Sequence, residues 1–159
     1  MQRGQQWLEE LLRLSRLPAG VQVTDSDESQ DDKPSYWLTI DQTKLTAQQI
    51  QILIGSEGTV LDAIQYLANS ILNLGQGESQ QAAYTIELDG YRARRQAELQ
   101  ALATNAAQRV RETGEEFEMK SLSSAERRQV HTFLKECDDL ETMSRGQEPD
   151  RRLVVRRRS

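Results

Sequence analysis

Hydrophobic residues in the first half of the chain recur with the periods of short helices and strands. Apolar positions at helical spacing, among them Trp7, Leu8 and Leu11, predict an amphipathic helix over residues 3–16, which ends before Pro18. Further helices are predicted at 46–53 and 60–72, and strands at 21–23, 36–41 and 83–88, with a polar loop over 24–35. The predicted order of elements is therefore α-β-β-α-α-β.

The pattern changes at Asp89-Gly90, where we predict a domain boundary. Ser123 and Glu126 have the spacing of a capping box, which predicts the start of a helix that runs to about Cys137. Strands are expected at 117–119, 139–144 and 152–156, and the turn-rich segment 145–150 predicts a hairpin. A long helix is expected over residues 91–113, with a buried stripe of Leu99, Leu102, Ala103, Ala106 and Val110.

These patterns predict an α+β protein of two small domains, residues 1–90 and 91–159. Only 36% of the residues are hydrophobic and 5% are aromatic, so each half can bury only a small core. Domains of this size are marginally stable alone, and we expect them to depend on a partner.

The formal net charge of −5 conceals an asymmetry between the two halves. Residues 1–90 hold 5 Lys/Arg and 13 Asp/Glu, whereas residues 91–159 hold 15 and 12. Charges act over a Debye length of roughly 8–10 Å, so a polyanion responds to the local cluster rather than to the net charge of the chain. The second half is therefore the predicted site of contact with a polyanion.

Several classes of protein and site are disfavoured by the sequence. It contains no apolar run long enough to cross a membrane, and its start lacks the apolar segment of a signal peptide. Cys137 is the only cysteine, which fits a reducing compartment and leads us to expect a cytoplasmic protein. Cys137 also has no neighbouring His, and the acidic stretch 25–32 lacks the glycine of a calcium loop, so no metal or cofactor is expected.

The first candidate site is the segment Gly55-Ser56-Glu57-Gly58 between two predicted helices. Two glycines allow the backbone to approach a phosphate closely, and the amides that open the next helix can bind an anion. An ordinary helix–turn–helix needs no ligand and explains the same residues equally well. The carboxylate of Glu57 would repel a phosphate, so the loop is not a strong anion site.

The second candidate site is on the predicted helix after Ser123. Arg127 and His131 are four residues apart and project from the same side of a helix, and Lys135 extends that side by a turn. Arginine and imidazole both suit contacts with nucleic acid. The alternative interpretation is a solvated helix face with no ligand.

The two halves resemble known domains. The α-β-β-α-α-β order with Gly55–Gly58 and the segment 61–67 resembles a type II KH domain. The segments 126–131, 140–146 and 151–155 resemble the R-3-H domain, a single-stranded nucleic-acid-binding domain named for Arg-x-x-x-His. KH followed directly by R-3-H resembles the bacterial Jag (KhpB/EloR) family, without the extra N-terminal domain of many members.

The resemblance implies a non-enzymatic cytoplasmic protein that binds single-stranded RNA or single-stranded DNA. It implies that Arg127 pairs with a phosphate, that His131 contacts a phosphate or a base, and that Arg145, Arg151 and Arg152 line the same groove. It also implies that the KH half pairs with itself or with a separate single-KH protein.

Two other functions fit the residues. The first is a protein-interaction scaffold, in which the acidic KH half pairs with another protein and RNA binding is incidental. The second is a nuclease that uses His131 with Asp138, Asp139 and Glu141, which we rank last because no second base or metal cluster is evident.

Overall fold

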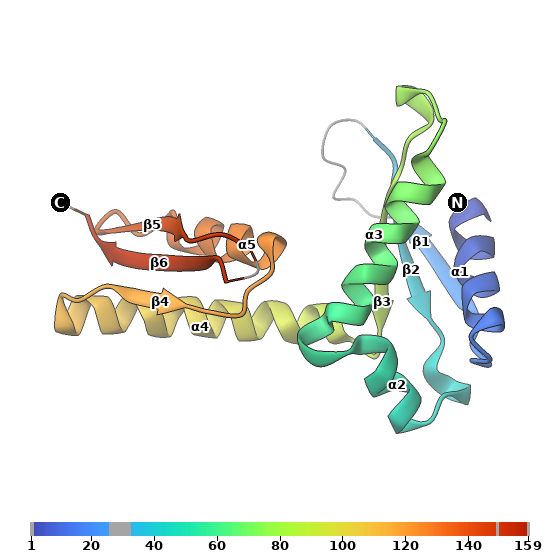
Figure 1. Ribbon diagram of the computed structural model, residues 1–159, viewed down its shortest axis with the longest axis horizontal. Coiled ribbons are helices and arrows are strands. Elements are labelled where there is room, and N and C mark those ends of the chain that lie inside the picture. Colours follow the sequence, from blue (N-terminus) through green and yellow to red (C-terminus); the bar gives the residue numbers. More distant parts are fainter. Residues whose placement is uncertain (1, 26–32, 149, 159) are drawn as a thin grey trace. The chain divides into compact units, whose positions relative to one another are not determined.

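A computed structural model describes residues 2–25, 33–148 and 150–158 of the chain (Figure 1). Contacts divide the chain into two compact units, Met1–Arg92 and Ala93–Ser159. Most of the predicted polar loop 24–35, and of the acidic stretch 25–32, lies outside the described residues. Among those residues, no helix is both long enough and apolar enough for a membrane span.

The first unit has the predicted element order. Its helices and strands are α1 Gln2–Leu14, β1 Val21–Asp25, β2 Ser35–Ile40, α2 Ala47–Ile54, α3 Thr59–Asn73 and β3 Ala83–Leu88. The sheet order is β1-β2-β3, with β1 antiparallel and β3 parallel to β2. Parallel neighbours need a long crossover connection, and the helix pair α2–α3 supplies it. This arrangement confirms the type II KH-like fold.

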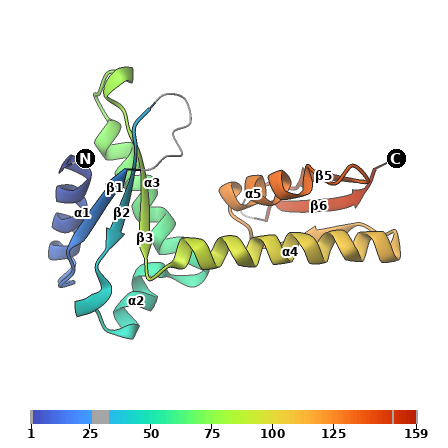
Figure 2. The same ribbon diagram turned by 180° about the vertical axis from the view of Figure 1, so that it is seen from behind.

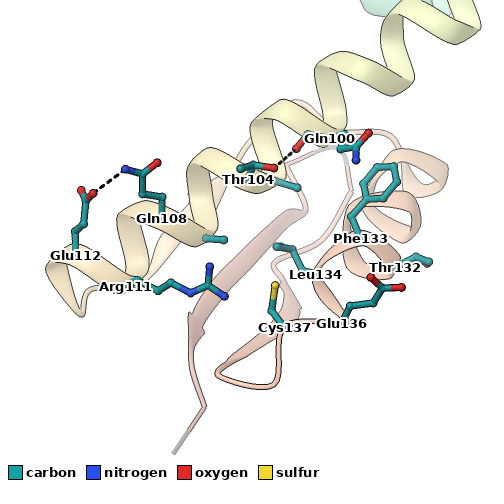
Figure 3. A pocket seen from close by; sticks show the side chains of 12 residues that line it. Gln100, Thr104, Gln108, Arg111, Glu112, Thr132, Phe133, Leu134, Glu136 and Cys137 are labelled. Atoms are coloured by element: carbon teal, nitrogen blue, oxygen red, sulfur yellow. Dashed lines mark hydrogen bonds between the residues drawn. The ribbon is translucent and has the colours of Figure 1, made fainter.

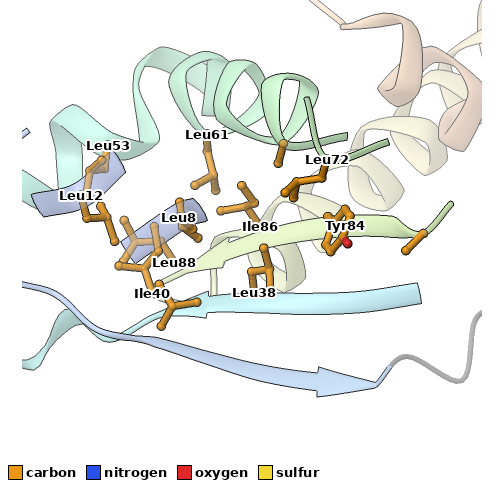
Figure 4. Packing of buried hydrophobic residues seen from close by; sticks show 13 residues of the cluster. Leu8, Leu12, Leu38, Ile40, Leu53, Leu61, Leu72, Tyr84, Ile86 and Leu88 are labelled. Atoms are coloured by element: carbon orange, nitrogen blue, oxygen red, sulfur yellow. The ribbon is translucent and has the colours of Figure 1, made fainter. Parts of the chain in front are cut away.

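The helices of the first unit cover one face of the sheet, and the core lies between the two layers (Figure 4). Strand residues alternate between faces, so Leu38 and Ile40 of β2 and Ile86 of β3 point toward the helices and are almost completely buried. Leu8 of α1 and Leu61 of α3 meet them from the helical layer and are fully buried. Burial of each such side chain stabilises the fold by about 1.5–3 kcal/mol.

The free edge of β3 is covered by amide side chains of α3. Asn69 donates to the Tyr84 carbonyl at 2.7 Å and accepts from the Tyr84 N–H at 2.9 Å. Asn73 makes the same pair of bonds to Ala82 one turn later, at 2.8 and 2.9 Å. The Gln65 side-chain oxygen accepts from the Ile86 N–H at 3.0 Å. The side chains at helical spacing thus satisfy alternate residues of an edge strand, whose backbone groups would otherwise be open to another strand.

The second unit contains a three-stranded antiparallel sheet packed against helices (Figure 2). Its elements are α4 Tyr91–Thr113, which begins in the first unit, then β4 Phe117–Met119, α5 Ser124–Leu134, β5 Leu140–Arg145 and β6 Arg152–Arg157. The sheet order is β4-β6-β5, and the pairing of β5 with β6 confirms the predicted hairpin.

The core of the second unit is built from one stripe of α4. Leu99, Ala103, Ala106 and Val110 are buried, as the periodicity predicts. The prediction for Leu102 is wrong, because its side chain is 37% exposed at the margin of the stripe. Ala107 is buried instead, on the side of the stripe opposite Leu102.

Candidate nucleic-acid interface

Helix α5 begins with the predicted capping box. The Ser123 side-chain oxygen accepts from the Glu126 N–H at 3.2 Å, and the Glu126 carboxylate accepts from the Ser123 N–H at 2.8 Å. The same carboxylate accepts from Arg95 Nε of α4 at 2.7 Å. These bonds fix where α5 begins and therefore the direction in which Arg127, the next residue, projects.

Arg127 is a buried cation, with only 5% of the residue exposed. Its Nη1 donates to the carbonyls of Leu122 at 2.7 Å and Arg151 at 3.2 Å. Its Nη2 donates to the Ser124 hydroxyl at 2.8 Å and forms an ion pair with the Glu148 carboxylate. A guanidinium stays charged in proteins, so its burial requires these partners. Arg127 joins the start of α5 to the hairpin, and the phosphate contact that the resemblance implies stays a prediction.

His131 is exposed one turn further along α5. Its Nδ1 shares a hydrogen bond with the Thr142 hydroxyl of β5. This contact orients the imidazole across the gap between α5 and the sheet. Within the described residues, Nε2 has no protein partner, so one ring nitrogen is available to a ligand.

Arg127 and His131 line one groove between α5 and the hairpin, with a volume of about 440 Å³. The free cations of this groove are Arg128 and Arg151. Both are exposed, and in the described part of the chain neither side chain has an ion pair or hydrogen bond. The groove is lined by Ser124, Arg127, Arg128, His131, Thr142, Met143, Ser144, Arg151 and Leu153.

Arg128 is a groove residue that the sequence analysis missed. Its spacing of three residues from His131 is a helical-neighbour spacing and was a usable signal. The expected pair of Arg127 and His131 lines the same groove, but the more accessible cation is Arg128.

Arg145 and Arg152 are not among the residues that line this groove, and their contact with nucleic acid stays a prediction. Arg145 of β5 lies opposite Arg152 of β6 in the strand register. Arg152 directly precedes the core residue Leu153, and successive strand residues point to opposite faces of the sheet. Their side chains therefore lie on the outer face of the sheet, away from α5.

Acidic residues of β4 and of the turn before it form ion pairs with Arg145 and Arg152. Arg145 donates to Glu116 at 2.9 Å, a bond that raises the pKa of the guanidinium, and Arg152 donates to Glu118 at 2.9 Å. The Arg152 hydrogen bond, followed by the charges of Arg152 and Arg145, lowers the pKa of the Glu118 carboxyl. Lys135 caps the end of α5 in solvent and is not part of the groove lining.

A larger cavity of about 540 Å³ lies between α4 and the end of α5 (Figure 3). Phe133, Leu134 and Cys137 form one side of it. Arg111 at its rim donates to the Asp139 carboxylate at 2.6 and 2.7 Å, which lowers the pKa of Asp139 to about 2. The Arg111 cation is therefore already paired, and the cavity lacks the free positive charge that the groove has.

The Gly55–Gly58 loop is shaped by its glycines. Both have positive φ, 74° and 79°, and Gly58 is buried against the ring of Tyr91, which a Cβ would strike. Ser56 and Glu57 are exposed at the tip. The turn itself requires the glycines, so their presence needs no ligand, and binding by this loop stays a prediction.

Comparison with known proteins agrees with this architecture. Residues 97–157 match the R3H domain. The chain is 32% identical over 111 residues to the RNA-binding protein KhpB of Clostridium symbiosum, an alignment that covers 70% of this chain and 49% of that protein. It is 35% identical over 104 residues to KhpB of Lactiplantibacillus plantarum, covering 65% and 32%, and 28% identical over 113 residues to KhpB of Bacillus subtilis, covering 70% and 53%. The alignments thus span about half or less of these relatives.

The fold and the groove define a two-domain protein in which an R3H domain follows a type II KH-like domain. The chain is similar to the KhpB proteins, and the predicted resemblance to the Jag (KhpB/EloR) family is confirmed.

Proposed function

We propose that the chain binds single-stranded RNA in the groove between α5 and the β5–β6 hairpin, and that it acts by binding rather than by catalysis. The observation that carries the proposal is the convergence of Arg128, Arg151 and His131 on one groove of an R3H domain. The relatives are named RNA-binding proteins. A cytoplasmic post-transcriptional regulator is the role we infer.

The chemistry of the groove suits an unpaired strand. Arginine forks bind phosphate in a bidentate manner, and a guanidinium or imidazole plane can stack on an exposed base. The groove also offers the hydroxyls of Ser124 and Ser144 to phosphate or sugar oxygens. Phosphate contacts of this kind make binding fall as salt rises, because bound counterions are released.

The test is the double substitution Arg128→Ala with Arg151→Ala in the full chain. We expect RNA affinity to fall roughly thirtyfold, since two phosphate contacts are lost and each contributes about 1 kcal/mol in high dielectric. The slope of affinity against salt should fall by roughly one unit or more. Fluorescence anisotropy with a labelled oligouridine, and with its DNA counterpart, measures both quantities.

The control is Arg111→Ala, which removes a positive charge from the same unit outside the groove. Its RNA affinity should stay within about twofold of the parent, as expected for an exposed ion pair. If the double variant bound RNA as tightly as the parent, the groove would not be the binding site.

A second proposed activity is protein pairing through the first unit. Helix α3 and the residue that caps its end expose apolar side chains that the core does not use, at Val60, Leu67, Ile71 and Leu74, with 39%, 45%, 48% and 80% exposure. Their spacing places them on one stripe of the helix. Contiguous exposed apolar surface marks interaction sites in soluble proteins. We infer that the stripe holds a second copy of this domain or a separate single-KH protein.

A further inference from the structure

The charge of Arg127 is satisfied by a partner that is far more exposed than Arg127 itself. The Arg127 side chain is 5% exposed and the Glu148 side chain is 55% exposed. Glu148 lies in the connection between β5 and β6, whereas Arg127 lies in α5 and lines the groove. A carboxylate from the hairpin connection therefore reaches across to a guanidinium that faces the ligand space.

The other acceptors of Arg127 are held in place by the backbone. Nη1 is bound to the backbone carbonyls of Leu122 and Arg151, and Ser124 belongs to the same turn of α5. Only the Glu148 carboxylate is carried on a long side chain that can rotate into water. An anion that enters the groove can therefore replace one partner of Arg127, and that partner is Glu148.

We propose that Ser124 and Arg127 form a phosphate subsite in which the Glu148 carboxylate is an internal stand-in that a phosphate of the RNA displaces. The proposal rests on the proposed function of the groove. Both anions suit a guanidinium fork. The Ser124 hydroxyl bonds Arg127 and also lies 3.4 Å from the Glu148 carboxylate, within a site that a phosphate oxygen can share.

The exchange has two physical consequences. Arg127 keeps an anionic partner in both states, so its buried charge is never left unpaired, which would be costly. A phosphate that approached while Glu148 was in place would meet a like charge. Glu148 therefore weakens RNA binding and restricts the subsite to anions that bind arginine better than a carboxylate does.

The first test is Glu148→Gln in the full chain. Glutamine has nearly the same shape and keeps an oxygen that can accept from Arg127, but it carries no charge. Affinity for labelled oligouridine should rise roughly three- to tenfold, the effect of removing one charge near a phosphate. Adding Ser124→Ala to this variant should remove part of the gain.

The matched control is Glu136→Gln, which changes the net charge equally at an exposed residue outside the groove lining. Its affinity should stay within about twofold of the parent, because an exposed charge far from the site is screened. Equal affinities for Glu148→Gln and the control, or weaker binding by Glu148→Gln with the fold intact, would overturn the proposal.

The second test uses inorganic phosphate and does not depend on RNA. Phosphate titrated into carbon- and nitrogen-labelled parent protein should shift the Arg127 side-chain nitrogen signals and the Glu148 carboxylate carbon signal together, and it should bind Glu148→Gln more tightly. Unmoved Arg127 signals at saturating phosphate in both proteins would also reject the subsite. Because this readout needs only the folded parent, it decides the case even if Glu148→Gln is unstable.

The two tests separate the subsite from the proposed function. If Arg128→Ala with Arg151→Ala abolished RNA binding but Glu148→Gln changed nothing, RNA binding would stand and the displacement would fall. If phosphate displaced Glu148 but the chain bound no RNA, the phosphate subsite would stand and the proposed RNA binding would fall. Oligonucleotides with and without a terminal phosphate distinguish a strand end from an internal phosphodiester as the displacing group.

Discussion

At the scale of single residues, we expect Glu57 to decide whether the Gly55–Gly58 loop can hold a phosphate. It is exposed at the tip with a left-handed backbone, φ 52°, between glycines that satisfy the turn. The loop opens α3, whose first amides favour an anion. The carboxylate opposes that preference, so the loop offers favourable geometry with unfavourable charge.

Glu57→Lys tests this balance. We expect RNA affinity to rise roughly ten- to thirtyfold, because the change from −1 to +1 is two charge units and each unit-charge contact contributes about 1 kcal/mol in high dielectric. The gain should shrink at high salt. Glu78→Lys, at an exposed residue of the same unit, is the control and should give a smaller gain. An unchanged affinity for the folded Glu57→Lys protein would mean that the loop does not contact RNA.

At the scale of elements, the amide side chains of α3 close the edge of β3. The Asn69 bonds to the backbone of Tyr84 do what a neighbouring strand would do, without presenting a strand of their own. The helix therefore stabilises the sheet through its polar side as well as through its apolar core residues. An open edge strand is a template for association, and these bonds remove that template.

Asn69→Ala should lower the free energy of unfolding by about 1–3 kcal/mol, because it leaves the half-buried N–H and C=O of Tyr84 without partners. Urea denaturation measures the change. Ser70→Ala, at the next and exposed position of α3, corrects for the helix preference of alanine and should stay within about 0.5 kcal/mol of the parent. Equal stabilities for the two variants would show that the edge bonds contribute little.

At the scale of the whole molecule, the apolar stripe of α3 and the groove of the second unit belong to different compact units. The proposed protein pairing and the proposed RNA binding should therefore respond to substitutions separately. Effects at distant sites usually add.

Leu67→Glu tests the pairing. The charge should prevent burial of the stripe, so we expect loss of any dimer in light scattering after size exclusion, with RNA affinity per groove unchanged. Gln48→Glu, an exposed charge change on α2, should leave the assembly state as it is in the parent. A parent that is monomeric at all concentrations and with any single-KH protein would contradict the pairing.

The sequence by itself determined the elements and their order. The hairpin, the Ser123–Glu126 capping box and the helical stripes depend on contacts between residues close in the chain, and local spacing encodes them. The charge asymmetry between the halves is likewise a property of composition alone. The motifs that carry the family resemblance are contained in these local segments.

Only the tertiary structure decided what each arginine does. Strand pairing places Arg145 and Arg152 on the outer face beside Glu116 and Glu118, and no local spacing reveals that register. The partners of Arg127 come from residues up to 24 positions away, so its burial cannot be deduced from the helix that contains it. A basic side chain is free or occupied according to which carboxylates the fold brings within bonding distance, and the fold left Arg128 and Arg151 in the groove without such partners in the described residues.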